Sequence, residues 1–387
     1  SPLLIGVDND FSLIASDATP MAKYTDKYVE LADKQLAIIT AHDVEVYDSE
    51  LNKVNFGYVK KDPDFVIKDK GNYSHFMLKE IEEIKPVVEK IINTYSKNNE
   101  FNIDQELINN IKESDEIIFI GCGTSYHASL IGVRYFEHFG KSSSSYIASE
   151  WAFYPRFPGK KPFIIFLSQS GETADIIHCQ KIVKEQNLKS LVITNTKGSS
   201  LERSCDYSLL IHAGLEVSVA STKAYVAQVA VLAILVRAVY DRFDIFNDLK
   251  ACLKVIEAIR YNQKEKILEI ALEIKDCQHL FFLGRGYDYD LSLEASLKLK
   301  EVSYIHSEAI AGGELKHGPI ALIEENTPVI VFVSDDKTAA SMRGNIEEVK
   351  ARGAKVYTIS TENLFAYGDK IVTPSYRRFL SSIAISS

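Results

Sequence analysis

Three loops of the sequence combine hydroxyl side chains with small residues, a composition suited to holding a phosphate group. They are Gly121-Cys122-Gly123-Thr124-Ser125, Ser168-Gln169-Ser170-Gly171-Glu172-Thr173 and Val219-Ala220-Ser221-Thr222-Lys223. The first two follow apolar runs and the third opens a long apolar stretch, so each lies at or near a predicted helix N-terminus. Unpaired N–H groups and the helix dipole favour an anion there. Serine and threonine are also common N-caps, but three such loops together predict a phosphate cradle.

A second segment carries groups for acid–base chemistry. Glu294, Lys298 and Glu301 are spaced four and three residues apart, so on a helix they share one face. Solvated salt bridges are the commoner reason for such spacing. The flanking apolar residues instead predict a largely buried helix, where charges need a reason; they are Leu293, Leu297, Leu299 and Val302. A desolvated Lys–Glu pair can move a proton between adjacent carbons and stabilise an enediolate, which is aldose–ketose chemistry.

A histidine in a glycine-rich stretch is a third candidate. His317 precedes Gly318-Pro319 and could move protons at neutral pH, although a lone histidine is more often structural. Nucleotide binding is disfavoured, because the glycine pairs at 121–123 and 284–286 lack the third glycine of G-x-G-x-x-G and no G-x-x-x-x-G-K-[S/T] occurs. We therefore expect no cofactor.

The elements that must carry these loops repeat once along the chain. From Glu116 onward, short apolar strands alternate with longer helices, as in parallel α/β domains. The predicted strands are 117–120, 163–167, 191–194 and 209–211, then 280–283, 329–333 and 356–359. Matching strand ends, such as Gly121-Cys122-Gly123 and Gly284-Arg285-Gly286, are separated by about 163 to 166 positions. This internal repeat predicts two doubly wound domains, packed about a pseudo-twofold axis.

The repeat also supplies a control for phosphate binding. Where the first copy has Ser168-Gln169-Ser170-Gly171, the second has Ser334-Asp335-Asp336-Lys337. Two added carboxylates would repel a phosphate, so only the first repeat is expected to bind it.

The segment before the repeat is of a different kind. Apolar runs at 3–7, 11–15, 36–39 and 44–47 predict a small antiparallel sheet, residues 62–73 read as a linker, and helices are expected at 76–95 and 103–111. We divide the chain into 1–60, a linker with helices at 61–112, a first domain at 113–248 and a second at 249–387.

Bulk properties describe an ordinary globular chain of 387 residues, 46% hydrophobic and 25% charged. The net charge of −9 argues against nucleic acid and anionic membrane as partners.

Five separated cysteines without a C-x-x-C pair predict reduced thiols in the cytoplasm, with no disulfide framework and no zinc site. The longest apolar stretch, 224–236, is too short to cross a bilayer and is expected to be a buried helix. No secretion signal is visible, and the missing initiator Met predicts a fragment or a processed product.

Five motifs resemble the isomerase half of the glutamine:fructose-6-phosphate aminotransferase family. In order they are GCGTSYHAS, SQSGETADI, EVSVASTKAY, LKLKEVSYIHSEA and GGELKHGPIAL, and the likeness runs from about Gly71 to Thr361. That family has two sugar isomerase (SIS) domains after an N-terminal glutaminase domain. Residues 1–60, including Ala15-Ser16-Asp17, resemble the closing strands of that glutaminase domain. The resemblance implies an α/β fold of two SIS domains preceded by a small β remnant.

The resemblance also implies an activity and a role for each site residue. The family makes glucosamine-6-phosphate from fructose-6-phosphate and glutamine-derived ammonia, for amino-sugar and cell-envelope precursors. Residues implied to bind the sugar phosphate are Thr124, Ser125, Ser168, Gln169, Ser170 and Thr173, with Val219 and Ser221 contacting the sugar. Glu301 would move the proton between C1 and C2, Lys298 would assist at the oxyanion, and His317 of a neighbouring subunit would open the ring. A homodimer that binds fructose-6-phosphate, glucosamine-6-phosphate or glucose-6-phosphate is implied.

Two departures from the family pattern qualify that expectation. The family's catalytic N-terminal cysteine and glutamine site have no counterpart here, so no glutamine hydrolysis is expected. The family's closing tail, similar to DQPRNLAKSVTVE, carries a lysine that forms a Schiff base with the open-chain sugar, and this sequence stops at Ile385-Ser386-Ser387. We expect sugar-phosphate binding with weak or lost isomerisation. The alternatives are a stand-alone SIS sugar-phosphate isomerase or ketosamine-phosphate deglycase, and a non-catalytic sugar-phosphate sensor.

Overall fold

The computed structural model describes residues 3–8, 10–15, 21, 24–25, 27–41, 43–60 and 70–385. It comprises two units, Ser1–Tyr73 and Ser74–Ser387. Most of the predicted linker at 62–73, together with Ser16, Asp17 and the last two residues of the chain, lies outside the described residues.

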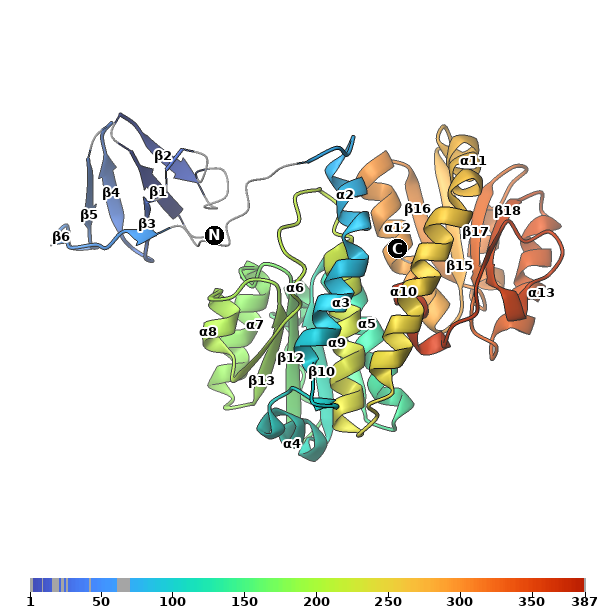
Figure 1. Ribbon diagram of the computed structural model, residues 1–387, viewed down its shortest axis with the longest axis horizontal. Helices are drawn as coiled ribbons and strands as arrows, with labels where there is room; N and C mark the ends of the chain where they lie inside the picture. Colours follow the sequence, from blue (N-terminus) through green and yellow to red (C-terminus); the bar gives the residue numbers. More distant parts are fainter. Residues whose placement is uncertain are drawn as a thin grey trace. The chain divides into compact units, whose positions relative to one another are not determined.

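The first unit is built from short antiparallel strands (Figure 1). One sheet has the order β2-β1-β3-β7 and the other β4-β5-β6. Their bounds are β1 Leu3–Val7, β2 Ser12–Ala15, β3 Lys27–Leu31, β4 Leu36–Ile39, β5 Val44–Tyr47, β6 Lys53–Val54 and β7 Val59–Lys60. Ile5, Val29, Val44 and Val46 form its small core. All four predicted strands are present, and β3, β6 and β7 are additional strands.

The first parallel domain is a five-stranded sheet of order β11-β10-β12-β13-β14. The strands are β10 Glu116–Gly121, β11 Ser143–Ile147, β12 Pro162–Ser168, β13 Ser190–Thr194 and β14 Tyr207–Leu210. The chain order reverses between β10 and β12, and in such sheets ligands bind outside the carboxyl ends of the strands at that reversal. The first two hydroxyl-rich loops follow β10 and β12, so the fold brings them to the expected ligand position.

Helices cover both faces of this sheet (Figure 1). On one face lie α7 (Ala174–Glu185), α8 (Ser200–Ser204) and the short α6 (Ala148–Trp151). The opposite face packs against α5 (Gly123–His138), α3 (Ile84–Tyr95), α4 (Gln105–Glu113) and α9 (Lys223–Val239). The predicted helix at 76–95 is interrupted at Glu83, which separates α2 (Phe76–Glu82) from α3.

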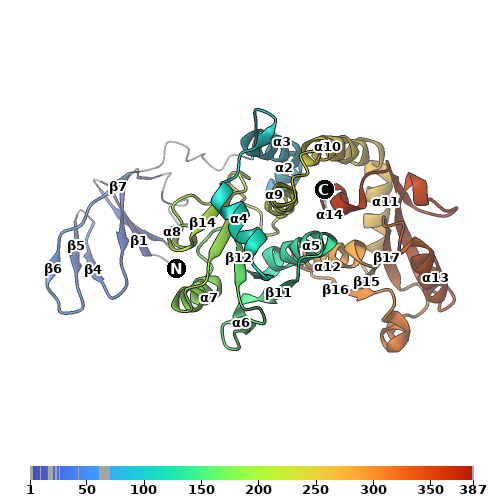
Figure 2. The same ribbon diagram turned by 90° about the horizontal axis from the view of Figure 1, so that it is seen from below.

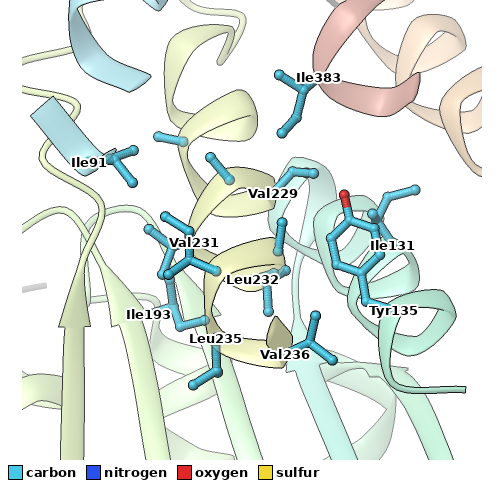
Figure 3. Packing of buried hydrophobic residues seen from close by; sticks show 14 of the residues in the cluster. Ile91, Ile131, Tyr135, Ile193, Val229, Val231, Leu232, Leu235, Val236 and Ile383 are labelled. Atoms are coloured by element: carbon cyan, nitrogen blue, oxygen red, sulfur yellow. The ribbon is translucent and has the colours of Figure 1, made fainter. Parts of the chain in front are cut away.

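Helix α9 is the centre of the core. Every one of its residues is buried, as its apolar sequence predicts. Val231 and Leu235 lie toward Ile193 of the sheet, and Val229, Leu232 and Val236 lie toward α5 and the C-terminal segment (Figure 3). Each such side chain contributes roughly 1.5–3 kcal/mol when fully buried. Within the described part of the chain, no helix is both long and apolar enough to span a membrane.

The second parallel domain repeats the same strand order, β16-β15-β17-β18-β19. Its strands are β15 His279–Gly284, β16 His306–Ala311, β17 Pro328–Val333, β18 Lys355–Thr361 and β19 Ile371–Thr373. Its main helices are α12 (Tyr287–Ser303) and α13 (Ala339–Lys350). It is preceded by α10 (Ile245–Asn262) and α11 (Lys264–Ile274). The two identical strand orders confirm the doubly wound repeat.

The two repeats meet through their first helices. Helices α5 and α12, each of which follows the first strand of its repeat, pack side by side (Figure 2). A short C-terminal segment, η4 (Arg378–Leu380) and α14 (Ser381–Ala384), packs against α9, α10 and α12. In it, Phe379 stacks on Tyr135 of α5 with ring centroids 3.9 Å apart. The α5–α12 contact places the loops of the first repeat next to the acid–base helix of the second.

Candidate active site

The loop after β10 turns directly into α5. Gly123 has a positive φ of 53°, and Cys122 is the N-cap. At Gly121 a Cβ atom would lie 2.9 Å from the backbone of Ser125 and Tyr126, so only glycine permits this close turn. Thr124 and Ser125 therefore fall in the first turn of α5, and the Ser125 hydroxyl accepts a hydrogen bond from Nε2 of Gln228 on α9 (2.9 Å).

The loop after β12 is held by its own hydroxyl groups. The Ser168 Oγ lies 3.1 Å from Thr173 Oγ1 and accepts the Gly171 N–H at 3.1 Å. The Glu172 N–H donates to Ser170 Oγ at 3.1 Å. Gly171 has φ of 67°, and a Cβ there would lie 2.1 Å from Ser199 Oγ. The loop is thus a fixed array of hydroxyls before α7, with Gln169 and Ser170 partly exposed.

The third loop differs from the expectation. The N–H groups of Thr222 and Ala224 at the start of α9 donate to Oε1 of Glu216 at 2.8 and 3.3 Å, and the Ser221 hydroxyl donates to Oε2 at 2.8 Å. Burial raises the pKa of Glu216. The carboxylate of Glu216 therefore already occupies the N-terminus of α9. The prediction that each of the three loops provides a free helix N-terminus for an anion is wrong for the third loop. Val219 is 91% exposed beside it.

The three charged residues of α12 share one face, as their spacing predicts. The Lys298 ammonium lies 3.0 Å from Glu301 Oε2 and 3.5 Å from Glu294 Oε1. The side chains of Glu294, Lys298 and Glu301 are only 3%, 17% and 26% exposed, so a solvated face is excluded. The helix is largely buried, as the flanking apolar residues predict, because Leu291, Ala295 and Leu299 pack in the core of the second repeat, although Val302 near its end is 50% exposed.

The Thr124 hydroxyl joins the two repeats. It donates to Glu294 Oε1 at 3.1 Å and accepts a hydrogen bond from the Lys298 ammonium at 2.9 Å. A hydroxyl of the predicted phosphate cradle thus touches the predicted acid–base pair. An ammonium held between carboxylates and a hydroxyl can stabilise an oxyanion, and the neighbouring Glu301 carboxylate can accept a proton.

Sequence reasoning missed His127 and Gln228, and treated Glu294 only as part of a helix face. His127 Nδ1 lies 2.7 Å from Glu294 Oε2, across the boundary between the repeats. His127 could have been identified from its spacing, because it stands three residues after Thr124 and so lies on the same helix face.

In the second repeat, a carboxylate of the protein lies at the position equivalent to the predicted phosphate cradle. Asp288 stands where the first repeat has Ser125, and its carboxylate accepts the Ser334 N–H at 2.8 Å and the Ser334 hydroxyl. Ser334 is itself the counterpart of Ser168. Burial raises the pKa of Asp288 to about 6. Asp335 and Asp336, predicted to repel phosphate, are paired with Arg378 at 3.3 and 3.1 Å. The second repeat therefore differs from the first for another reason than the one predicted: the Asp288 carboxylate, not Asp335 or Asp336, lies where the first repeat would hold a phosphate.

His317 lies apart from this network. It ends the 3-10 turn η1 (Leu315–His317) after β16 and is exposed. Among the residues that the structure describes, no hydrogen bond or ion pair joins its ring to Lys298 or Glu301.

All five cysteines are free thiols. No group of three or more potential metal ligands occurs in the described ranges.

Comparisons with known proteins agree with this arrangement. A family model described as SIS domain matches residues 110–238 and 273–365. The glutamine–fructose-6-phosphate aminotransferase (isomerizing) of Bacillus subtilis (strain 168) is 42% identical over 392 residues, covering 99% of this chain and 65% of the relative. The enzyme of that name from Streptococcus agalactiae serotype V is 41% identical over 399 residues, covering 100% and 66%. The chain therefore spans about 65% of the length of these relatives.

Solved structures share the fold. The C-terminal domain of glucosamine-fructose-6-phosphate aminotransferase from Francisella tularensis superposes with a TM-score of 0.77 at 32% identity, covering 82% of this chain and 94% of that one. A putative phosphosugar isomerase from Silicibacter pomeroyi gives 0.67 at 23% identity, covering 80% and 94%, which supports the fold alone.

Proposed function

The chain belongs to the glutamine–fructose-6-phosphate aminotransferase (isomerizing) family, with two SIS domains, and from this premise we propose that it is the sugar-phosphate isomerase part of such an enzyme. In the proposed reaction, fructose-6-phosphate and glutamine-derived ammonia give glucosamine-6-phosphate. The reaction needs a phosphate anchor and, beside it, a base and a cation that move a proton between C1 and C2.

The hydrogen bond between Lys298 and Thr124 carries this proposal. It joins the hydroxyl-rich loops of the first repeat to the acid–base helix of the second at 2.9 Å. Neither repeat has both parts, since the second repeat fills its own anion position with Asp288. A sugar phosphate anchored in the first repeat would therefore present its C1–C2 end to α12.

Each site residue has a proposed role. The phosphate is held by hydroxyls and backbone groups of Thr124, Ser125, Ser168, Gln169, Ser170 and Thr173. Glu301 moves the proton between C1 and C2, and Lys298 stabilises the oxyanion that forms. The Lys298–Glu301 contact of 3.0 Å supports this division, because it places a cation that can stabilise an oxyanion beside a carboxylate that can accept a proton. Val219 and Ser221 contact the sugar.

The remaining proposals concern the assembly. His317 is exposed, so it is available to a second copy, and we assign to it the ring opening in a neighbouring subunit of a homodimer. Free thiols support a cytoplasmic location. A glutaminase domain supplies the ammonia in the full-length enzyme. A stand-alone isomerase or deglycase would share the cradle, but would not need the antiparallel unit, which is included in the match to the relatives.

Calorimetric titration with fructose-6-phosphate, glucose-6-phosphate and the free sugars tests the proposal. Wild type should bind the phosphorylated hexoses and not the free sugars. Ser170→Asp, which places a carboxylate in the cradle, should abolish binding. Ser142→Asp, an exposed serine before β11 at the opposite edge of the sheet, is the matched control and should bind as wild type. Loss of binding in the control alone, or no binding of either phosphorylated hexose by wild type, would contradict the proposal.

A further inference from the structure

His127 is the one residue of α5, besides Thr124, whose side chain bonds to Glu294 among the described residues. It follows Thr124 by three positions, so both side chains lie on the helix face that meets α12. Its Nδ1 is 2.7 Å from Glu294 Oε2, and the two side chains are 15% and 3% exposed. A hydrogen bond from this ring to a carboxylate oxygen requires the proton on Nδ1, because an ionised carboxylate only accepts.

Glu294 uses its two oxygens for different partners. Oε2 receives His127, whereas Oε1 receives the Thr124 hydroxyl at 3.1 Å and lies 3.5 Å from the Lys298 ammonium. The orientation of the carboxylate thus determines where negative charge sits beneath Lys298. If Oε2 lost its donor, the carboxylate could rotate and draw the ammonium away from Glu301.

Neighbouring charges do not compete for this contact. Asp290, one turn before Glu294 on α12, is paired with Arg134 of α5 at 2.8 Å. The other ring close to His127 is Tyr126, with centroids 5.9 Å apart. Among the described residues, Glu294 is therefore the one hydrogen-bonding partner of the His127 ring.

We propose that His127 is a positioning residue for proton transfer, which acts across the boundary between the repeats by orienting Glu294 and thereby the Lys298–Glu301 pair. This inference rests on the proposed function, since it assigns His127 to the same reaction. It adds a residue from the proposed phosphate-binding repeat to the acid–base machinery of the other repeat.

The kinetic test follows solvent deuterium incorporation at C1 of fructose-6-phosphate. His127→Leu should lower the maximal exchange rate on the order of 10- to 100-fold with little change in the half-saturating concentration, because the phosphate loops are untouched. His127→Asn should recover most of the rate, since its Nδ2 can donate from the position of Nδ1. His178→Leu, an exposed histidine on α7, is the control and should match wild type. Equal rates for His127→Leu and wild type would overturn the proposal.

Two further measurements separate this inference from the proposed function. In a Glu294→Gln background, His127→Leu should have no additional effect on exchange, because it acts through Glu294. Nitrogen-15 NMR of the wild-type imidazole should show a protonated Nδ1, and an Nδ1 without a proton would overturn the assignment even if His127→Leu fails to fold. If wild type binds neither phosphorylated hexose, the proposed function fails for this chain. If it binds them but shows no exchange, as weak or lost isomerisation would give, the NMR result alone decides the role of His127.

Discussion

The ammonium of Lys298 lies 2.9 Å from the hydroxyl of Thr124, although the two residues belong to different repeats and stand 174 positions apart. Lys298 belongs to the helix with the carboxylates, and Thr124 to the loop proposed to hold phosphate. One hydrogen bond therefore joins the two halves of the candidate active site. It depends on the packing of α5 against α12 rather than on either repeat alone.

Replacing Glu301 by glutamine should separate binding from chemistry. The amide keeps the shape but cannot accept the proton, so hydrogen exchange at C1 of fructose-6-phosphate should fall by about 10²–10⁴-fold. Affinity for glucose-6-phosphate should stay close to that of wild type, because the phosphate loops are intact. Glu308→Gln, at an exposed position on β16, is the control. A wild-type exchange rate in Glu301→Gln would remove Glu301 from its proposed role.

Replacing Gly171 by alanine should lower the free energy of unfolding more than replacing the nearby Gly198 by alanine. Both Gly171 and Gly198 have positive φ, 67° and 75°, so an alanine is strained at either site. Only at Gly171 does a Cβ meet another atom, Ser199 Oγ at 2.1 Å. Gly198→Ala should lower the free energy of unfolding by about 1 kcal/mol, and Gly171→Ala by clearly more, with loss of glucose-6-phosphate binding. Urea unfolding and calorimetry check this, and equal losses of stability would contradict it.

Stability should depend on pH through Asp288. Burial raises the pKa of its carboxyl to about 6, so between pH 4 and 6 the folded state holds a proton that the unfolded state releases. The contribution of this group to the free energy of unfolding is therefore largest below pH 4, falls as pH rises to about 6, and is constant above that. Asp288→Asn should abolish this part of the profile, a difference on the order of a few kcal/mol in urea unfolding at pH 4.5 and 7. Parallel profiles for wild type and variant would disprove the assignment.

Removing the Asp288 carboxylate should create an anion site beside Ser334 in the second repeat. Asp288→Ser places there the residue type that the first repeat has at Ser125, and frees the N–H and hydroxyl of Ser334. Inorganic phosphate should then raise the melting temperature of this variant more than chloride of equal ionic strength does. Asp288→Asn, which still fills the space, should gain no more than wild type. The same increase in all three proteins would show that Asp288 does not stand in for an anion.

Much of the fold was predictable because strands and helices follow local patterns. Runs of β-branched and aromatic residues, such as Ile117–Ile120, predicted the central strands of both sheets, and the repeat spacing predicted their equivalence. The edge strands β11 and β16 escaped prediction because they contain serine, histidine and glutamate and are not continuously apolar. The break at Glu83 escaped prediction because apolar spacing continues across it.

The sequence by itself determined which residue types stand at the ends of the strands and which charged residues share a helix face. Those features depend on spacing along the chain, with a period of about 3.6 residues for a helix and two for a strand. Only the tertiary structure decided that Lys298 meets Thr124, that His127 meets Glu294, and that Glu216 and Asp288 occupy positions expected for a ligand. Such contacts arise where separate elements pack together, and no local periodicity records which side chains then face each other.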